Sequence, residues 1–343
     1  MSKTVLVSGG AGFIGSHVSV ELLEAGYKVV VADNFSNCDR SCYEGVKKIT
    51  GQEDLPLEVI DFCDLAAVKD LFARYRIDAV IHFAAFKAVG ESVQKPLMYY
   101  RNNLVSFINV LEAAQEQGGC QVLFSSSATV YGEPDKVPVT EQSPRKEATS
   151  PYGNTKQMCE DILRDTVKAS DGAIKGILLR YFNPIGAHPS ALIGELPRGV
   201  PNNLVPFITQ TAAGRRECLS IFGNNYPTPD GTCLRDYIDI VDLAKAHVAA
   251  VTRMLEGRMK EACEVYNIGT GHPLSVLELV TSFEKVNGIK LNYRFAPRRE
   301  GDVTAIWADP SLANKELGWK AERSIDDTLR AAWKWEKHLS ENI

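Results

Sequence analysis

The sequence lacks the features of several large classes of protein. No apolar stretch approaches the roughly 20 residues that a membrane span needs, and the apolar run at residues 5–7 is too short for a signal-peptide core. The 38 Lys and Arg residues do not outnumber the 43 Asp and Glu residues, and the net charge of −5 provides no basic field for a polyanion. We therefore expect a soluble, cytoplasmic protein that binds neither membranes nor nucleic acids.

Metal-binding and disulfide patterns are also missing. The eight cysteines show no CxxC spacing, and none of the six histidines forms an HxxxH pair. Cys38 and Cys42 could form half of a metal site, but no nearby Cys or His completes it. The sequence therefore predicts free thiols and no metal. Repeats, low-complexity tracts and Gly/Ser linkers are absent as well, so it does not predict a repeat protein or two tethered modules.

What the chain does contain is a regular alternation of strand-like and helix-like segments over its first 180 residues. With 343 residues, 45% of them hydrophobic, it can form a large core. The expected strands are residues 4–8, 28–33, 57–61, 79–83, 121–126 and 174–180, and the clearest helices are 14–24, 65–75, 97–117 and 152–169. This order predicts an α/β protein with a Rossmann-type, doubly wound parallel sheet.

The pattern changes after Tyr181, where seven prolines between residues 184 and 229 interrupt it. We expect helices at 238–254, 274–286 and 325–338 and a strand at 264–268. This half should cap the sheet rather than continue it. The sequence thus predicts two domains, residues 1–180 and a smaller substrate-binding domain over 181–343. Their boundary is not sharp, because parts of the second half are expected to return to the first.

A glycine-rich turn follows the first expected strand and precedes the first helix. Gly9, Gly12 and Gly15 satisfy the spacing with which a βα turn approaches a pyrophosphate, whose charge meets backbone N–H groups and the positive end of the helix dipole. Asp33 ends the second strand, 21 residues after Gly12, where its carboxylate can bind ribose hydroxyls and repel a 2′-phosphate. Although a solvated strand-end Asp is the simpler interpretation of Asp33 alone, the combination indicates NAD. Asp61 and Phe62, at the end of the third strand, suit the adenine edge.

A second group of residues suggests proton transfer. Ser150 and Pro151 predict a helix start, which places Tyr152 and Lys156 four residues apart on one helix face. A nearby ammonium and a nicotinamide cation would favour the Tyr152 phenolate, and Ser127, after the strand at 121–126, could hold a substrate hydroxyl beside it. Tyr-x-x-x-Lys occurs by chance and serines are ordinary turn formers, so the inference rests on their combination with the glycine turn.

These segments resemble the extended short-chain dehydrogenase/reductase superfamily and, within it, the UDP-glucose 4-epimerase family. The resemblance runs nearly end to end. Its motifs are residues 9–15, Asp33-Asn34, residues 125–132, residues 150–156, Arg180-Tyr181-Phe182-Asn183-Pro184, Asn202-Asn203-Leu204, residues 221–224, residues 231–237 and Arg298-Arg299-Glu300-Gly301-Asp302.

The resemblance implies catalytic roles for three residues: Tyr152 as the base at the sugar C4 hydroxyl, Lys156 as its electrostatic partner and cofactor ribose ligand, and Ser127 as the orienting hydroxyl. Bound NAD would take the C4 hydrogen, the 4-keto sugar would turn, and the hydrogen would return to its opposite face. Besides Gly9, Gly12, Gly15, Tyr152 and Lys156, the residues implied to line the NAD site are Phe13, Ile14, Asp33, Asn34, Phe35, Ser36, Asn37, Cys38, Asp61, Phe62, Phe83, Lys87, Asn102 and Phe182.

The implied substrates are UDP-glucose and UDP-galactose, interconverted in galactose metabolism, and the implied assembly is a homodimer through the helices at 97–117 and 152–169. Besides Ser127 and Tyr152, the residues implied to contact substrate are Asn183, Asn203, Leu204, Ser220, Ile221, Phe222, Arg235, Arg299, Asp302 and Ile306. Arginines suit the diphosphate because a guanidinium binds phosphate bidentately. Ile306 would border the sugar C2 substituent, where a large aromatic excludes N-acetylated sugars and a small residue admits them.

Three other functions remain open at this point. Ile306 is intermediate in size, so additional activity on UDP-N-acetylglucosamine is an alternative, although we expect it to be weak or absent. A nucleotide-sugar 4,6-dehydratase would place Asp and Glu where this chain has Ala128 and Thr129, and the decarboxylases of this group tend to carry Glu at the latter position. A non-catalytic NAD-binding regulatory module would usually lack Tyr152 and Lys156.

Overall fold

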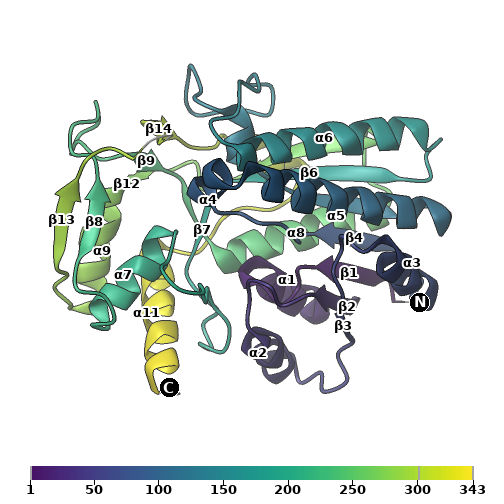
Figure 1. The fold of residues 1–343 in the computed structure, drawn as a ribbon, viewed down its shortest axis with the longest axis horizontal. Helices are drawn as coiled ribbons and strands as arrows, with labels where there is room; N and C mark the ends of the chain where they lie inside the picture. Colours follow the sequence, from purple (N-terminus) through teal and green to yellow (C-terminus); the bar gives the residue numbers. More distant parts are fainter. Residues whose placement is uncertain (1, 300–301, 342–343) are drawn as a thin grey trace.

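The computed structural model describes residues 2–299 and 302–341, and it confirms the doubly wound parallel sheet (Figure 1). Seven parallel strands lie in the order β11-β6-β5-β4-β1-β2-β3. Their bounds are β1 Thr4–Ser8, β2 Lys28–Asp33, β3 Leu57–Val59, β4 Ala79–His82, β5 Gln121–Ser127, β6 Lys175–Tyr181 and β11 Cys263–Ile268. The chain order reverses between β1 and β4, and ligands of such sheets bind at the carboxyl ends of the strands beside this point.

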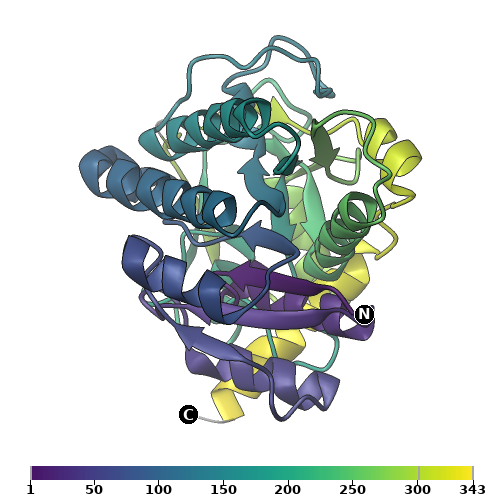
Figure 2. The same ribbon diagram turned by 90° about the vertical axis from the view of Figure 1, so that its right-hand side faces the viewer.

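Two helical layers cover the sheet because successive side chains of a strand point to opposite faces (Figure 2). Val5 and Val7 pack in one apolar core and Leu6 in the other. The first layer contains α1 Phe13–Glu24, α2 Arg40–Thr50, α8 Ile240–Leu255 and α10 Ser311–Leu317. The second contains α3 Leu65–Arg74, α5 Pro96–Glu116 and α6 Pro151–Ala169. Both faces of the sheet are thus buried, as the continuous aliphatic strands predict.

A smaller part of the molecule lies beside the carboxyl ends of the strands and has its own apolar core, which includes Val205, Ile208, Phe283 and Leu329. Its elements are β7 Asn183–Ile185, α7 Leu204–Ala212, β8 Leu219–Phe222, β9 Leu234–Arg235, β10 Tyr237–Asp239, β12 Leu274–Ser275, α9 Val276–Asn287, β13 Tyr293–Ala296, β14 Ala305–Ile306 and α11 Ile325–Glu341. Two short elements of the first half are α4 Val89–Gln94, which borders the cavity described below, and the 3₁₀ helix η1 Ala128–Tyr131, which packs against Ile306 and Ala308.

The structure corrects several expectations about the second half. It does more than cap the sheet, because β11 pairs with β6 as an edge strand and α8 packs on α1. Two of the expected helices begin later than predicted: Asp239 and Ser275 are helix caps, and the residues before them form β10 and β12. The boundary between residues 180 and 181 stays a prediction.

Four helices, α2, α4, α7 and α10, were not predicted. The helix α2 was not predicted because Gly45 lowers the helix propensity of its sequence. Packing nevertheless requires a glycine at this position. A Cβ atom there would lie 2.3 Å from the Leu192 carbonyl oxygen.

Within residues 2–299 and 302–341, none of the helices combines the length and the apolar character needed to cross a membrane.

Candidate active site

A cavity of about 880 Å³ opens at the carboxyl ends of the central strands. Its wall combines the glycine turn, the ends of β2, β4 and β5, the start of α6, and residues of the smaller part of the molecule. The residues expected to bind a cofactor and those expected to bind a substrate therefore border one continuous cavity.

The glycine turn forms one end of this cavity. Gly9 has φ +72°, and its N–H donates to the Ala32 carbonyl oxygen over 2.8 Å. A Cβ on Gly15 would lie 2.3 Å from the Gly9 oxygen, so the helix can pack this close to the turn only without a side chain. Gly12 is the N-cap of α1 and supplies no side-chain cap. The first N–H groups of α1 are therefore available to an anion at this point.

Asp33 lies at the end of β2, and backbone and thiol donors hold its carboxylate. Its Oδ2 accepts from the Ala11 N–H at 3.1 Å, and its Oδ1 accepts from the Phe35 N–H at 2.9 Å and the Cys38 thiol at 3.4 Å. Burial together with this carboxylate raises the pKa of Cys38. The carboxylate orientation is thus fixed beside the glycine turn, and lone pairs remain for hydroxyl donors.

Tyr152 and Lys156 lie in the first two turns of α6, which begins as predicted: the Ser150 hydroxyl accepts from the Gly153 N–H at 3.2 Å, and Pro151 occupies the first turn. The Lys156 Nζ lies 5.8 Å from the centre of the Tyr152 ring and donates to the Ser125 carbonyl oxygen at 2.7 Å. Burial raises the pKa of Tyr152 to about 12, and a hydrogen bond with Ser127 offsets part of this effect. Burial also lowers the pKa of Lys156 to about 8. The chain alone therefore keeps the phenol protonated at neutral pH.

The lowered pKa of Lys156 has a measurable consequence for stability. Between the folded pKa of about 8 and the ordinary 10.5, the unfolded chain still binds the lysine proton whereas the folded chain does not. We therefore expect the free energy of unfolding of wild type to rise by up to about 3 kcal/mol relative to that of Lys156→Met as pH rises through this interval. Below pH 8 the difference between the two proteins should not change with pH. Urea unfolding of both proteins at pH 7, 9 and 10.5 measures this; a difference that does not vary with pH would contradict it.

Ser127 ends β5 and caps η1, its hydroxyl accepting from the Thr129 N–H at 3.2 Å. Ser127, Ala128 and Thr129 all line the cavity. Ala128 and Thr129 occupy the two positions at which a 4,6-dehydratase would have its acid and base. Both therefore border the cavity without a carboxylate.

The smaller part of the molecule contributes cations to the opposite wall. Arg235, Arg299 and Asp302 all line the cavity. Asp302 accepts two hydrogen bonds from Arg299, at 3.1 and 2.9 Å, and lies 3.6 Å from Arg235. One carboxylate for two guanidinium groups leaves a positive site that suits a diphosphate. Glu300 and Gly301, in the motif between these residues, lie outside the described residues.

Most of the residues expected at the site lie in the cavity wall. On the cofactor side these are Gly9, Gly12, Phe13, Ile14, Gly15, Asp33, Asn34, Ser36, Asn37, Cys38, Asp61, Phe62, Phe83, Lys87, Asn102 and Phe182. On the substrate side they are Ser127, Tyr152, Asn183, Asn203, Arg235, Arg299, Asp302 and Ile306, with Lys156 between the two groups. Their roles stay predictions, because the cavity shows proximity and not contact.

Five expected residues lie outside this wall: Phe35, Leu204, Ser220, Ile221 and Phe222. In β8 the side chains alternate, so Ile221 points into the core of the smaller part, whereas Phe222 is exposed on the other face, with the Arg299 guanidinium 5.8 Å from its ring centre. Leu204 packs against the same core, and Phe35 against the core beside α1 and α2.

Sequence reasoning missed Glu195, which lines the cavity from the loop between β7 and α7. Its Oε1 accepts from the Lys87 Nζ at 3.0 Å and from the Asn203 Nδ2 at 2.6 Å. A single Glu in a proline-rich loop carries no recognisable pattern, so the sequence contained no signal for it.

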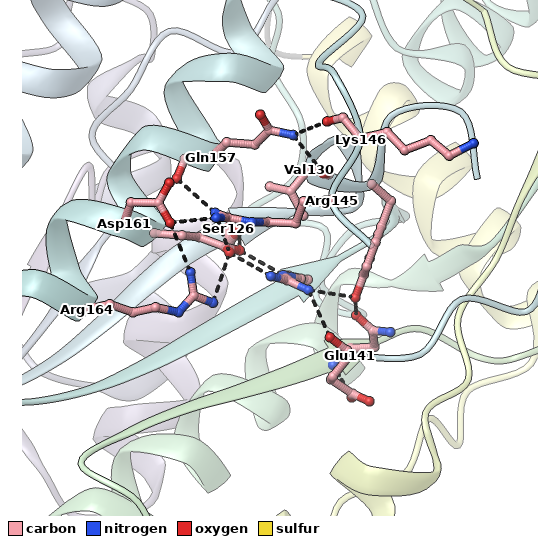
Figure 3. Close-up of polar contacts among 12 residues, drawn as sticks. Ser126, Val130, Glu141, Arg145, Lys146, Gln157, Asp161 and Arg164 are labelled. Atoms are coloured by element: carbon pink, nitrogen blue, oxygen red, sulfur yellow. Dashed lines mark hydrogen bonds and ion pairs between the residues drawn. The ribbon is translucent and has the colours of Figure 1, made fainter. Parts of the chain in front are cut away.

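Next to β5, a buried ionic network centres on Glu160, and its members Ser126, Arg145 and Arg164 are labelled in Figure 3. Glu160 accepts from the Ser126 hydroxyl at 2.6 Å and pairs with Arg180 at 2.8 and 2.7 Å. Arg164 and Arg145 approach the same carboxylate at 3.2 and 3.6 Å. Burial raises the pKa of Glu160, but its bonds with Arg180 outweigh this effect and hold the pKa below its ordinary value. The network thus joins α6 to β5 and β6, next to Lys156 and Ser127.

Comparison with known proteins places this geometry in a family. Residues 6–332 match the family model described as GDP-mannose 4,6 dehydratase. The chain is 52% identical to UDP-glucose 4-epimerase of Bacillus subtilis, over 97% of this chain and 96% of that one.

Solved structures of UDP-glucose 4-epimerases are also similar. That of Bifidobacterium longum, in complex with NAD⁺ and UDP, has a TM-score of 0.94 and 47% identity, over 99% of this chain and 100% of that one. That of Stenotrophomonas maltophila, with NAD and formylated UDP-arabinopyranose, has a TM-score of 0.95 and 45% identity, with the same coverage. The chain therefore belongs to the UDP-glucose 4-epimerase family of NAD-dependent isomerases.

Proposed function

We propose that this chain interconverts UDP-glucose and UDP-galactose by reversible inversion at C4 of the sugar. The observation that carries the proposal is that one cavity joins the glycine turn, the Tyr152–Lys156 pair and the Arg235–Arg299 site. These are the parts needed for a dinucleotide, for proton transfer and for a sugar diphosphate, respectively.

The residues present fit NAD. The uncapped start of α1 at Gly12 offers N–H groups to a pyrophosphate, and the fixed Asp33 carboxylate offers acceptors to ribose hydroxyls. The same carboxylate disfavours a 2′-phosphate. When bound, oxidised NAD supplies a reversible two-electron acceptor for the C4 hydrogen and a positive charge that favours ionised Tyr152.

The chain's own residues then perform the proton transfer. Tyr152 takes the proton of the C4 hydroxyl and later returns it, while Ser127 orients that hydroxyl. Lys156, held by the Ser125 carbonyl, keeps a positive charge 5.8 Å from the Tyr152 ring. Arg235 and Arg299 hold the diphosphate, so the 4-keto sugar can turn within the cavity without leaving it.

The decisive experiment is an assay of purified protein with UDP-galactose and no added cofactor. We expect conversion to UDP-glucose, because the redox step is reversed within each turnover and consumes no NAD. Absence of conversion both with and without supplied NAD would overturn the proposal, and so would accumulation of a 4-keto-6-deoxy sugar.

Substrate breadth depends on Ile306, which is buried in β14 beside Phe182 and Arg235 and lines the cavity. We expect wild type to prefer UDP-galactose to UDP-N-acetylglucosamine. Ile306→Gly should shift the ratio of the two kcat/KM values toward the N-acetylated sugar by about tenfold or more, because it removes a side chain next to the sugar. Steady-state kinetics with both sugars measures this ratio.

Ile306→Val, which removes one methylene, serves as the matched control. An unchanged ratio in Ile306→Gly would remove Ile306 as the specificity residue, and equal use of both sugars by wild type would contradict the expected preference.

We also propose a homodimer formed through α5 and α6. Three exposed apolar side chains lie on these helices outside the cavity wall: Leu97 and Ile108 on α5 and Met158 on α6. Exposed apolar side chains on packed helices are available for burial in an interface. Sedimentation equilibrium tests the assembly.

The eight cysteines are all free, which agrees with a reducing compartment and supports a cytoplasmic location.

A further inference from the structure

The loop between β7 and α7 contains a segment, residues 194–203, that borders the cavity and that we name the strap. It has no regular secondary structure and includes Pro197 and Pro201. Six of its residues line the cavity: Gly194, Glu195, Leu196, Pro197, Asn202 and Asn203. In Figure 1 the chain that leaves β7 passes between α11 and α2 before it reaches α7. The strap therefore lies between the two parts of the molecule.

The start of the strap is fixed from behind. The Trp335 indole on α11 donates to the Glu195 carbonyl oxygen at 3.0 Å. A Cβ on Gly194 would lie 2.5 Å from the Trp335 ring, so the backbone lies directly against the indole. On the other side, the Cys42 thiol of α2 donates to the Gly194 carbonyl oxygen at 3.8 Å. The main chain at residues 194–195 is thus anchored, and Leu196 and Pro197, which follow it, line the cavity.

Arg198 connects the strap to the loop after β2. Its Nη1 donates to the Ser36 carbonyl oxygen at 3.0 Å, and its Nη2 donates to the Cys38 carbonyl oxygen at 2.6 Å. A guanidinium fork can span two carbonyls in this way, whereas an ammonium cannot occupy both positions at once. Ser36 and Cys38 line the cavity directly after Asp33, so this contact closes the wall at the side where the dinucleotide is expected.

Glu195 makes a second connection, to the loop after β4. Its side chain is only 10% exposed, and its Oε1 accepts from both Lys87 and Asn203. Lys87 comes from the larger part of the molecule and Asn203 caps α7 in the smaller part. One carboxylate thus links both walls of the cavity to the anchored start of the strap.

We propose that the strap retains the bound dinucleotide, with Arg198 and Glu195 as the two residues that hold it closed. This inference rests on the proposed function, because it takes the ligand of the Asp33 side to be NAD. Irregular loops with few buried apolar contacts open at low free-energy cost, and loop opening often limits ligand release. The residues after 195 have no regular structure of their own. Arg216 binds the Gly199 carbonyl oxygen at 3.1 Å from the smaller part, so closure against the larger part depends on the bonds of Arg198 and Glu195.

The inference predicts faster release of NAD when either connection is removed. Arg198→Ala loses two charge-assisted hydrogen bonds, and we expect release to accelerate about tenfold. Arg198→Lys keeps the charge but not the fork, so its release rate should lie between those of wild type and Arg198→Ala. Glu195→Ala should also accelerate release, and Glu195→Gln, which keeps an acceptor oxygen, should have a smaller effect.

The experiment uses the protein as purified with its bound NAD. Excess alcohol dehydrogenase and ethanol reduce each NAD molecule that is released, and the absorbance of NADH gives the release rate independently of epimerase activity. Arg258→Ala is the control, because Arg258 is an exposed arginine paired with Glu256 after α8 and lies outside the cavity wall. Epimerase activity that falls on dilution of Arg198→Ala and returns on addition of NAD would be a second sign of impaired retention.

If Arg198→Ala and Glu195→Ala both release NAD at the wild-type rate, the strap does not retain the dinucleotide. If wild type holds NAD and epimerises UDP-galactose in that case, only this inference fails. Wild type that carries no NAD after purification would overturn this inference, while the assay with supplied NAD would still decide the proposed function. Wild type that carries NAD but does not epimerise would overturn the proposed function while the release rates still decide the role of the strap. Thermal unfolding of each variant separates a loosened strap from a misfolded protein, and Arg198→Lys is the milder substitution if Arg198→Ala does not fold.

Discussion

Replacing Tyr152 by phenylalanine should lower turnover of UDP-galactose by about 10²–10⁴-fold, the usual contribution of a general base. The substitution removes one hydroxyl and keeps the ring, so the packing at the start of α6 should persist and NAD should still bind. The hydroxyl is the group that Ser127 faces and whose pKa burial raises to about 12. Among the described residues of the wall, no other side chain combines a titratable hydroxyl with a lysine on the next helical turn.

Steady-state kinetics and the NAD content of the purified variant measure the two expectations separately. Tyr100→Phe is the matched control, since the Tyr100 hydroxyl accepts from the Asn154 side chain at 2.8 Å but lies outside the cavity wall. Turnover close to normal in Tyr152→Phe would exclude Tyr152 as the base. Loss of both NAD and turnover would instead indicate a role in binding.

Glu160→Leu should lower the free energy of unfolding by about 3–5 kcal/mol, because it leaves a buried cation without its partner. Glu160 is fully buried, and Arg180 is 3% exposed. The Arg180 guanidinium would keep its bond to Tyr131 at 3.0 Å but lose both bonds to the carboxylate. The Ser126 hydroxyl would also lose its acceptor.

The neighbouring Asp161 provides a control of the same charge on the same helix. It pairs with Arg145 at 2.7 Å and Arg164 at 3.4 Å, but its side chain is 52% exposed (Figure 3). Asp161→Leu should therefore cost no more than about 1 kcal/mol. Urea unfolding of the two variants measures the difference. If both variants lose the same free energy of unfolding, burial does not make the Glu160 network more important for stability than the exposed Asp161 pairs.

The sequence predicted the larger sheet well because each of its first six strands is a short aliphatic run that ends in a loop. The helix starts after Asp64 and at Ser150-Pro151 were also predicted to within one residue. The starts of α8 and α9 were missed although Asp239 and Ser275 are good caps, because apolar residues continue through them from β10 and β12. Periodicity alone does not separate a short strand from the helix that follows it.

The residues of the site could be predicted where their chemistry depends on local spacing. Gly9, Gly12 and Gly15 lie in one turn, and Tyr152 and Lys156 on one helix, so their arrangement follows from secondary structure. The positions of Ile221 and Glu195 do not. The first depends on which face of β8 is buried, and the second on a loop that meets Lys87 across the cavity. Both are set by tertiary packing that one sequence does not reveal.

The positions of β11 and α8 within the larger part of the molecule determine how this protein unfolds. A fragment that ended at residue 180 would lack both elements, so β6 would become an unpaired edge and the apolar face under α8 would be open to water. Each half thus needs the other to bury its apolar surface. The two halves should therefore melt in a single transition, and a truncated chain should aggregate rather than persist as a dinucleotide-binding fragment.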